Sequence, residues 1–582
     1  MNLSRTLVLA LILLSAKLAL AASPHETLTA LIDRQWQHEL ETSPEFATAI
    51  GDNRYNDRLS DESPAATGRE LDYDRKLLAD LQQIDPNQLS ADDRLNQNLL
   101  VRSLKVGIAG ARFKNWEMPV TQMAGPHLEY AGLENEMPFN NVRDYQNYLS
   151  RLRQLPTVFE QSIANMRLGM RDGLMPPRYL LEKVAEESTD VASKPLSQSL
   201  FTQPVRNFPS SVPAAERERL TREINEAVGN QVLPAYAHFA KFVKEEYAPK
   251  GRAEFGVWAL PDGDARYRHA IERLTTTTSD PEELHALGLK QVAEIEKQML
   301  VIANKQGYRD LKSFNAHIFA DKELHGKSAE QVIGLYQRYT NQMYSKLPQY
   351  FGRLPKNDLV VVPMDAFRAP NAVPADYSIG AGDGSRPGRI NVNEYDPTKR
   401  LLLNVEAIAY HEGIPGHHLQ FSIAQELTNV PPFRRFAQYN SFSEGWALYS
   451  ETLAHEMGFY QDPYSEYGRL QNLMWRSIRL VVDTGVHSKH WSRQQMIDFF
   501  HEHSAMDDQN IVTEVDRYIS WPGQALCYKL GEMTILKLRE KARLQLGAKF
   551  DIRAFHDAVL DKGPLPLDVL EASVNEWLAS RK

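Results

Sequence analysis

The chain of 582 residues has an ordinary globular composition, with 42% hydrophobic and 24% charged residues. These proportions and a single cysteine exclude a disordered, collagen-like or disulfide-stapled chain. The 66 Lys and Arg residues are outnumbered by 75 Asp and Glu residues, and the formal charge is −9 with no basic stripe. We therefore expect no nucleic-acid partner.

The first 21 residues have the layout of a secretory signal peptide. Arg5 precedes an apolar run from Leu7 to Leu14, and an A-x-A sequence ends at Ala21. The run is too short to span a bilayer, and no later segment reaches about 18 uninterrupted apolar residues. We expect an exported protein, periplasmic or secreted, with no stable membrane association after cleavage of residues 1–21. An uncleaved anchor is the alternative.

Helical patterns dominate the remaining chain. The first fits residues 25–50, and Ser90 with Asp93 marks a helix start farther on. Residues 140–172 and 215–247 fit long helices, whereas the Pro- and Ser-rich stretch 175–212 indicates a linker or a lid.

The clearest helix begins at Asp280, an N-cap residue followed by Pro281 and Glu283. Apolar residues then recur at helical spacing as far as Gly307, and residues 328–350 repeat the pattern. Ser492 with Gln495 marks another helix start.

A small β-sheet is expected near residues 359–393. The run 359–363 is rich in valine, and a Gly-rich turn leads into a second short run at 389–393. The second run could form an edge strand that pairs with an extended peptide. An ordinary surface hairpin explains the same pattern.

The residues that point to chemistry lie in the run HEGIPGHH, residues 411–418. A His-Glu pair followed by another histidine on the same helix face places two imidazoles on a metal and a carboxylate beside its water. The usual spacing is His, Glu, two residues, His. Here Pro415 occupies the place of the second histidine.

The second histidine ligand is therefore His417 or His418. At about 100° per residue, His418 lies within about 20° of His411 around a helix, whereas His417 is about 120° away. A straight helix would separate His411 and His418 by roughly 10.5 Å, but a break at residues 413–416 would bring them closer. This geometry favours His418 over His417.

A third ligand is expected at Glu444, 26 residues beyond His418, in the run SEGWALYSE. The gap accommodates the rest of one helix, a turn and an antiparallel return. Glu451 follows seven residues later on the same helix face and is a candidate hydrogen-bond acceptor for a ligand histidine. Without a metal, these residues would be ordinary solvated or satisfied helix residues.

The runs HEGIPGHHLQ and SEGWALYSE, with DTGVH at 483–487 and RYISWPGQALCYKLGE at 517–532, resemble a large bacterial family. It is catalogued as domain of unknown function 885 and placed among zinc metallopeptidases. The matching motifs span about 360–540. The site is more distantly similar to the carboxypeptidase Taq, thimet oligopeptidase and angiotensin-converting enzyme families.

This resemblance implies a mostly α, two-lobed metallopeptidase-like fold around a deep channel. We expect a helical amino-terminal lobe at 22–270 and a metal-site lobe at 271–582. The resemblance also implies one zinc ion (Zn2+), with His411 as first ligand, Glu412 as general base and Glu444 as third ligand. The stretch 413–416 departs from the pattern and leaves His417 or His418 as second ligand.

In the implied mechanism, Glu412 takes a proton from the attacking water and passes it to the leaving amine. Candidate donors to the developing oxyanion are Tyr518, Tyr528, Arg517 and His487. Arg517 could instead bind a substrate carboxylate. Core packing or a surface ion pair is the alternative role for each of the four.

We therefore expect an exported zinc-dependent hydrolase that cleaves oligopeptides as a carboxypeptidase or an oligopeptidase. A related hypothesis keeps the metal and changes the bond to an ester or a non-peptide amide. A catalytically silent peptide-binding protein is the alternative from a different class. The sequence has no long heptad repeat that would predict an oligomeric state.

Overall fold

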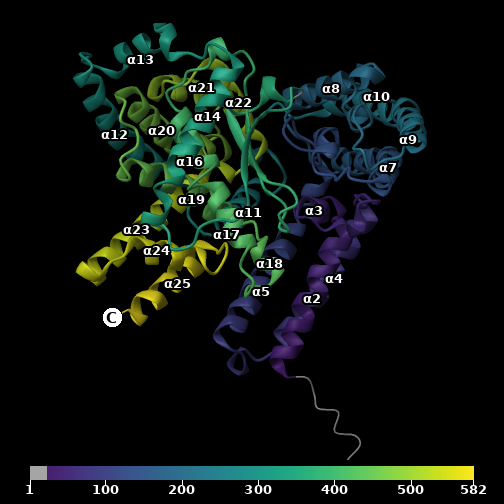
Figure 1. Cartoon of the computed structure of the whole chain (residues 1–582), viewed down its shortest axis with the longest axis horizontal. Helices are drawn as coiled ribbons and strands as arrows, with labels where there is room; N and C mark the ends of the chain where they lie inside the picture. The colour runs from purple at the N-terminus through teal and green to yellow at the C-terminus, as the bar shows by residue number, and fades with distance from the viewer. Residues whose placement is uncertain (1–22, 367, 582) are drawn as a thin grey trace, which may run out of the picture. The chain divides into compact units, whose positions relative to one another are not determined.

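The computed structural model describes residues 23–366 and 368–581, so the predicted signal peptide lies outside the described residues. The chain is predominantly helical and carries one three-stranded sheet, which confirms the predicted mostly α class and the sheet near 359–393 (Figure 1). None of the described helices is both long and apolar enough to cross a membrane.

Two compact units make up the described chain. The first comprises residues 23–39 and 65–112 and contains most of α2 (Pro24–Thr42), α4 (Pro64–Gln82) and α5 (Ala91–Ala111). The Ser90 side chain accepts a hydrogen bond from the Asp93 N–H, which confirms the predicted start of α5. The predicted lobe boundary near residue 270 stays a prediction.

The second unit comprises residues 40–64 and 113–581. Its first half contains α3 (Pro44–Ala49), α6 (Pro126–Glu129), α7 (Val142–Asp172), α8 (Arg178–Ser193), α9 (Ala214–Ala227), α10 (Leu233–Phe242), α11 (Gly263–Thr275), α12 (Pro281–Lys305), α13 (Leu311–Ala320), α14 (Ala329–Tyr344) and α15 (Leu347–Tyr350). Its second half contains α16 (Val405–Glu412), α17 (His417–Gln425), α18 (Pro432–Arg435), α19 (Asn440–Glu456), α20 (Pro463–His487), α21 (Arg493–His503), α22 (Asp508–Ser520), α23 (Cys527–Leu546), α24 (Ile552–Leu560) and α25 (Leu567–Ser580).

Helix α8 corrects the expectation of a linker or lid at 175–212. It packs against α10, and Leu180, Leu181 and Val184 are completely buried. The Pro and Ser residues of this stretch lie mainly in the turns that flank α8, whereas the helix itself carries an apolar face.

Helices α12 and α20 lie side by side (Figure 1) and contribute many residues to a large apolar core. Asp280 accepts a hydrogen bond from the Glu282 N–H, and Ser492 with Gln495 forms a capping box, so both predicted helix starts are confirmed. Helix α20 is buried along most of its 25 residues. Charged residues within it therefore need partners.

Asp483 of α20 is one such buried acid. The Tyr267 hydroxyl donates to its carboxylate at 2.6 Å, and the Gly523 N–H donates at 3.1 Å. These contacts connect α20 to α11 and to the turn before α23. Burial raises the pKa of Asp483 to about 7, although both hydrogen bonds oppose this shift.

We expect the wild-type protein to lose stability relative to Asp483→Asn as the pH rises from about 4 to about 7. The folded-state pKa lies above the usual value of 3.8, so the folded state binds the proton more tightly and ionisation favours unfolding. A shift of about three pH units corresponds to about 4 kcal/mol. Thermal unfolding of both proteins across this range measures the change, and a pH-independent difference would contradict it.

The sheet has the strand order β1 (Leu359–Pro363), β3 (Gly388–Val392), β2 (Ala375–Ser378). Strand β3 is parallel to β1 and antiparallel to β2. The hypothesis of an edge strand at 389–393 is therefore wrong, because β3 is central. Strand β2 forms the edge of the sheet on that side of β3. No strand was predicted at its residues.

Candidate metal centre

The motif HEGIPGHH forms two short helices instead of one. Helix α16 ends at Glu412, and α17 begins at His417. The Gly416 N–H donates to the Tyr410 carbonyl at 3.0 Å, and a Cβ at Gly416 would lie 2.0 Å from the His411 carbonyl oxygen. Only glycine permits this close return of the chain.

The connection between these helices is held by α19. The Trp446 indole N–H and the Ser450 hydroxyl both donate to the Pro415 carbonyl oxygen, at 2.9 and 3.2 Å. Because α19 also carries Glu444, these contacts fix the motif relative to the expected third ligand.

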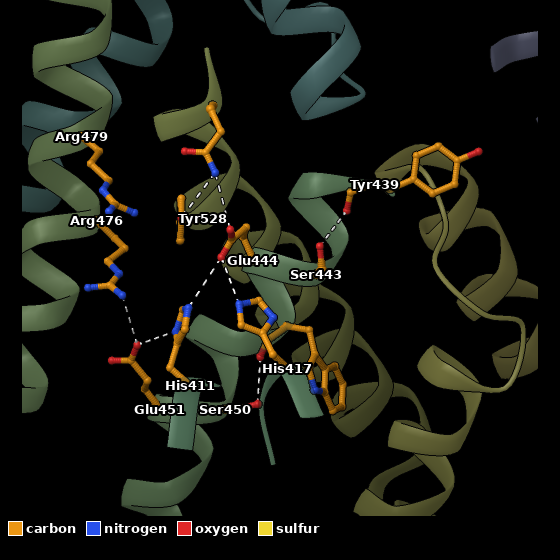
Figure 2. A network of polar contacts seen from close by, with 12 residues as sticks. His411, His417, Tyr439, Ser443, Glu444, Ser450, Glu451, Arg476, Arg479 and Tyr528 are labelled. Atoms are coloured by element: carbon orange, nitrogen blue, oxygen red, sulfur yellow. Dashed lines mark hydrogen bonds and ion pairs between the residues drawn. The ribbon is translucent and has the colours of Figure 1, made fainter. Parts of the chain in front are cut away.

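The structure brings His411, His417 and Glu444 together (Figure 2). One ligand atom from each lies within 4.8 Å of the others. Glu444 Oε2 is 3.6 Å from His411 Nε2 and 3.4 Å from His417 Nε2. Two imidazoles and one carboxylate around one point form a donor set typical of catalytic zinc sites.

His418, which the helix geometry favoured as second ligand, points elsewhere. Its Nε2–H donates to the Asn357 carbonyl oxygen, and its Nδ1 accepts from the Tyr377 hydroxyl, both at 3.0 Å. Burial lowers the pKa of His418 to about 4. The preference for His418 assumed a helix rotation that continues past His411, whereas the break at 413–416 gives α17 a new axis and turns His417 toward His411.

Glu444 is positioned by close contact between α19 and α23. A Cβ at Gly445 would lie 2.3 Å from the Gly531 Cα, and a Cβ at Gly531 would lie 1.9 Å from the Ser441 carbonyl oxygen. The two helix backbones therefore touch where α19 presents Glu444 to the histidines.

We expect Gly531→Ala to destabilise the fold by about 1–3 kcal/mol and to lower metal affinity, because the added methyl group separates α19 from α23. Gly334→Ala is the matched control, since Gly334 lies exposed in α14 and a Cβ there would meet nothing within 4 Å. Thermal unfolding and metal content test both variants. Unchanged stability in Gly531→Ala would show that the contact does not position Glu444.

His411 is oriented from behind by Glu451. His411 Nδ1–H donates to Glu451 Oε1 at 2.8 Å, which directs Nε2 toward Glu444 and confirms the predicted acceptor role of Glu451. Burial raises the pKa of Glu444, but the adjacent His411 and His417 outweigh it and hold this pKa well below its usual value. The Glu444 carboxyl is therefore ionised, as a metal ligand must be.

The three residues open into a cavity of about 320 Å³ that also contains Glu412. Burial raises the pKa of Glu412 to about 8, and the nearby His417 opposes this shift. The other lining residues are Val373, Pro374, Ala375, Asp376, Tyr377, Ile379, Ile408, Phe421, Gln438, Asn440, Ser443, Trp475, Arg476, Arg479, Arg517 and Tyr528.

Two of the four proposed oxyanion donors, Tyr528 and Arg517, line this cavity. Tyr518 and His487 do not lie among its lining residues. The Tyr518 hydroxyl donates to Glu514, and His487 Nε2–H donates to the Tyr518 carbonyl oxygen at 2.9 Å. Both side chains are buried in the core behind the cavity. The structure therefore places Tyr518 and His487 in the core, which was the alternative to a role as oxyanion donors.

Sequence reasoning did not identify Arg476 and Arg479, although both line the cavity. A signal was present, because two arginines three residues apart share one face of a helical run from Leu473 to Val482 in which Ser477 is the one other polar residue. Burying two cations in such a run is costly without a specific role.

Fold and site together define a predominantly helical protein with a candidate metal centre. Residues 44–574 match the family model described as "Bacterial protein of unknown function (DUF885)", and the chain belongs to this family. No curated protein matches the chain.

The solved structures that resemble the chain include those of two bacterial proteins. The "putative lipoprotein from Colwellia psychrerythraea" has 28% sequence identity and a TM-score of 0.91, over 96% of this chain and 100% of that chain. A "putative lipoprotein of unknown function from Shewanella oneidensis" has 19% identity and a TM-score of 0.67, over 95% of this chain and 99% of that chain. The second likeness shows the fold alone.

Proposed function

We propose that this protein is an exported metal-dependent hydrolase that cleaves peptide bonds in oligopeptides. The observation that carries the proposal is the convergence of His411, His417 and Glu444 in a cavity that also contains Glu412. A pair of histidines with a nearby glutamate ligand and a separate glutamate base is one of the arrangements that support metal-assisted hydrolysis.

The three ligand residues fit one zinc ion. The contacts of Glu444 Oε2 to the histidines, 3.4 and 3.6 Å, are longer than good hydrogen bonds, and this oxygen has no hydrogen-bond partner in residues 23–366 and 368–581. A buried carboxylate oxygen without a hydrogen bond is costly unless another group satisfies it. A bound divalent cation would supply that interaction.

When bound, zinc would activate water and polarise a substrate carbonyl as a Lewis acid. The charge of the bound cation would favour the ionised form of Glu412. The Glu412 carboxylate takes the proton from the attacking water and delivers it to the leaving nitrogen. Tyr528 donates its hydroxyl proton to the developing oxyanion. The Arg517 guanidinium and the Gln524 amide both donate to the Tyr528 oxygen, at 2.9 and 3.3 Å, so the Tyr528 proton is directed away from them and can meet substrate.

Strand β2 supports a peptide as substrate. It forms one edge of the sheet, and Ala375, Asp376 and Tyr377 line the cavity. An extended chain could pair with this edge and lie across the ligand residues.

Export rests on the signal sequence at residues 1–21 and on the description of the Colwellia psychrerythraea relative as a lipoprotein. The sequence itself has one cysteine, Cys527, which is fully buried in α23. Lipid attachment through a cysteine is therefore not part of the proposal for this sequence.

Purified protein lacking residues 1–21, incubated with a diverse peptide mixture and analysed by mass spectrometry, tests the proposal. We expect cleavage that a chelator abolishes, and the product ends will distinguish trimming from internal cleavage. Bound metal without peptide cleavage would indicate a hydrolase that cleaves an ester or a non-peptide amide. Peptide binding without metal would favour the catalytically silent alternative.

A further inference from the structure

We propose that Arg476, Arg479 and Arg517 bind the terminal carboxylate of a peptide, so that the enzyme removes one or two residues from the carboxyl end. This inference rests on the proposed function and names its substrate class. All three arginines line the same cavity as His411 and Glu412, and they come from α20 and α22 (Figure 2 shows Arg476 and Arg479).

The guanidinium groups have too few acidic partners. Glu514 lies 2.9 Å from Arg479 and 3.5 Å from Arg517. Within the described residues, the one acidic group near Arg476 is Glu451, at 3.9 Å. Glu451 is already bonded to His411, so three buried cations share two carboxylates.

Several guanidinium nitrogens are also without hydrogen bonds. Nε and Nη1 of Arg476, Nη1 of Arg479 and Nε of Arg517 have no partner within the part of the chain that the structure describes. Arg476 is 4% exposed and Arg479 is 1% exposed, so bulk water does not reach them freely. A buried charge with unsatisfied donors is costly, and an anion in the cavity would offset that cost.

Aromatic stacking fixes the orientation of two of these groups. The Trp475 ring centre lies 4.0 Å from the Arg476 Cζ and 4.4 Å from the Arg479 Cζ, and the Tyr528 ring centre lies 4.1 Å from the Arg479 Cζ. A guanidinium held in a fixed plane can donate two parallel hydrogen bonds to a carboxylate.

The acidic lining residues do not cancel this charge. Asp376 is paired with Arg368 at 2.7 Å, and Glu444 belongs to the candidate metal ligands. Glu412 is the proposed base. A carboxylate on the substrate is the anion that remains to complete the arginine cluster.

Tyr528 connects the arginines to the ligand histidines. Its ring is stacked 6.2 Å from the His411 ring and also contacts the Arg479 guanidinium. An extended peptide advances about 3.3–3.6 Å per residue. A terminal carboxylate on the arginines therefore places the last or the last but one peptide bond beside His411 and Glu412.

Three matched peptides test this inference on the zinc-loaded protein lacking residues 1–21. The first is a neutral peptide with a free carboxyl end, and the second is the same peptide with an amidated carboxyl end. The third is the amidated peptide with glutamate as its last residue. We expect kcat/KM for the free acid to exceed that for the neutral amide by at least about 100-fold, the size of two charge-assisted hydrogen bonds. Equal cleavage of acid and amide would overturn the inference while the hydrolase proposal stands.

The glutamate-bearing amide identifies the source of the carboxylate. Poor cleavage of this peptide supports recognition of the terminal carboxylate. Cleavage as efficient as that of the free acid would assign the arginines to an acidic side chain and overturn the trimming of carboxyl ends.

Binding separates this inference from catalysis. Peptide affinity is measured by calorimetry on the Glu412→Gln protein, with the free acid and the neutral amide. Tighter binding of the acid by at least about tenfold would support the carboxylate site, whether or not wild type cleaves the peptide. Absence of cleavage by wild type would separately reject the peptide-hydrolase proposal. Equal affinity for the free acid and the neutral amide would overturn the proposed carboxylate site.

Arg476→Gln should lower kcat/KM for the free acid far more than kcat/KM for the amide, and so remove most of the preference for the free acid. Arg469→Gln is the matched control, because Arg469 is 7% exposed in the same helix but pairs with Glu466 and is not among the residues that line the cavity. A preserved preference in folded Arg476→Gln would overturn the role of Arg476. If that variant does not fold, Arg476→Lys and the peptide comparison on wild type still decide the question.

Discussion

Alanine in place of His417 is expected to lower zinc affinity by more than about 100-fold, whereas alanine in place of His418 leaves zinc bound. His417 Nε2 faces His411 and Glu444, but His418 is engaged by Tyr377 and Asn357. Loss of an outer hydrogen-bond partner alone typically costs 10–100-fold in metal affinity, so loss of a direct ligand costs more. Competition with a chromophoric chelator measures both variants.

The neighbouring histidine provides a stringent control. His418→Ala removes two hydrogen bonds from a buried site, so it should lower the unfolding temperature without changing zinc stoichiometry. Loss of zinc in His418→Ala with retention in His417→Ala would reverse the assignment. Retention in both would remove residues 417 and 418 from the ligand set.

Glutamine in place of Glu412 is expected to keep zinc and to lower kcat by about 10²–10⁴-fold. The two side chains have nearly the same shape, but the amide cannot accept the proton of the attacking water. Because Glu412 lines the cavity without belonging to the ligand group, the substitution separates proton transfer from metal binding. Zinc content and peptide turnover are measured on the same preparation.

The outcome that contradicts this role is unchanged turnover in Glu412→Gln. Loss of zinc together with activity would instead show that Glu412 is a ligand. A folded protein with normal zinc and no turnover is the result that identifies it as the base.

Local sequence signals predicted much of the helical framework. The starts of α5, α12 and α21 follow from short polar side chains that cap the first helical turn, an interaction confined to neighbouring residues. Strand β1 was likewise predicted from its valine-rich run. Strand β2 was missed because four residues of mixed polarity acquire their conformation from pairing with β3.

The candidate site was predictable in composition but not in detail. His411, Glu412 and Glu444 follow from motif spacing, and Pro415 with its flanking glycines indicated a helix break. The new direction of α17 depends on tertiary contacts of the Pro415 carbonyl with Trp446 and Ser450, which no local pattern encodes. The sequence therefore could not decide between His417 and His418.

The arginines also show that long-range contacts decide which residues reach the cavity. Arg517 was identified because it lies in one of the motifs that carry the family resemblance, whereas Arg476 and Arg479 lie outside these motifs. Their proximity to His411 arises from the long-range contacts of α20 with α16. Similarly, Tyr518 and His487 belong to shared motifs but pack behind the cavity, so motif membership did not predict access to substrate.

A zinc titration of chelator-stripped protein, followed by the rate of cleavage of one peptide, tests the central claim most directly. We predict no cleavage without metal and a linear recovery that reaches a plateau at one zinc ion per chain. Full cleavage by the stripped protein, or a metal-loaded protein that cleaves no peptide, would contradict a zinc-dependent peptidase built on His411, His417 and Glu444.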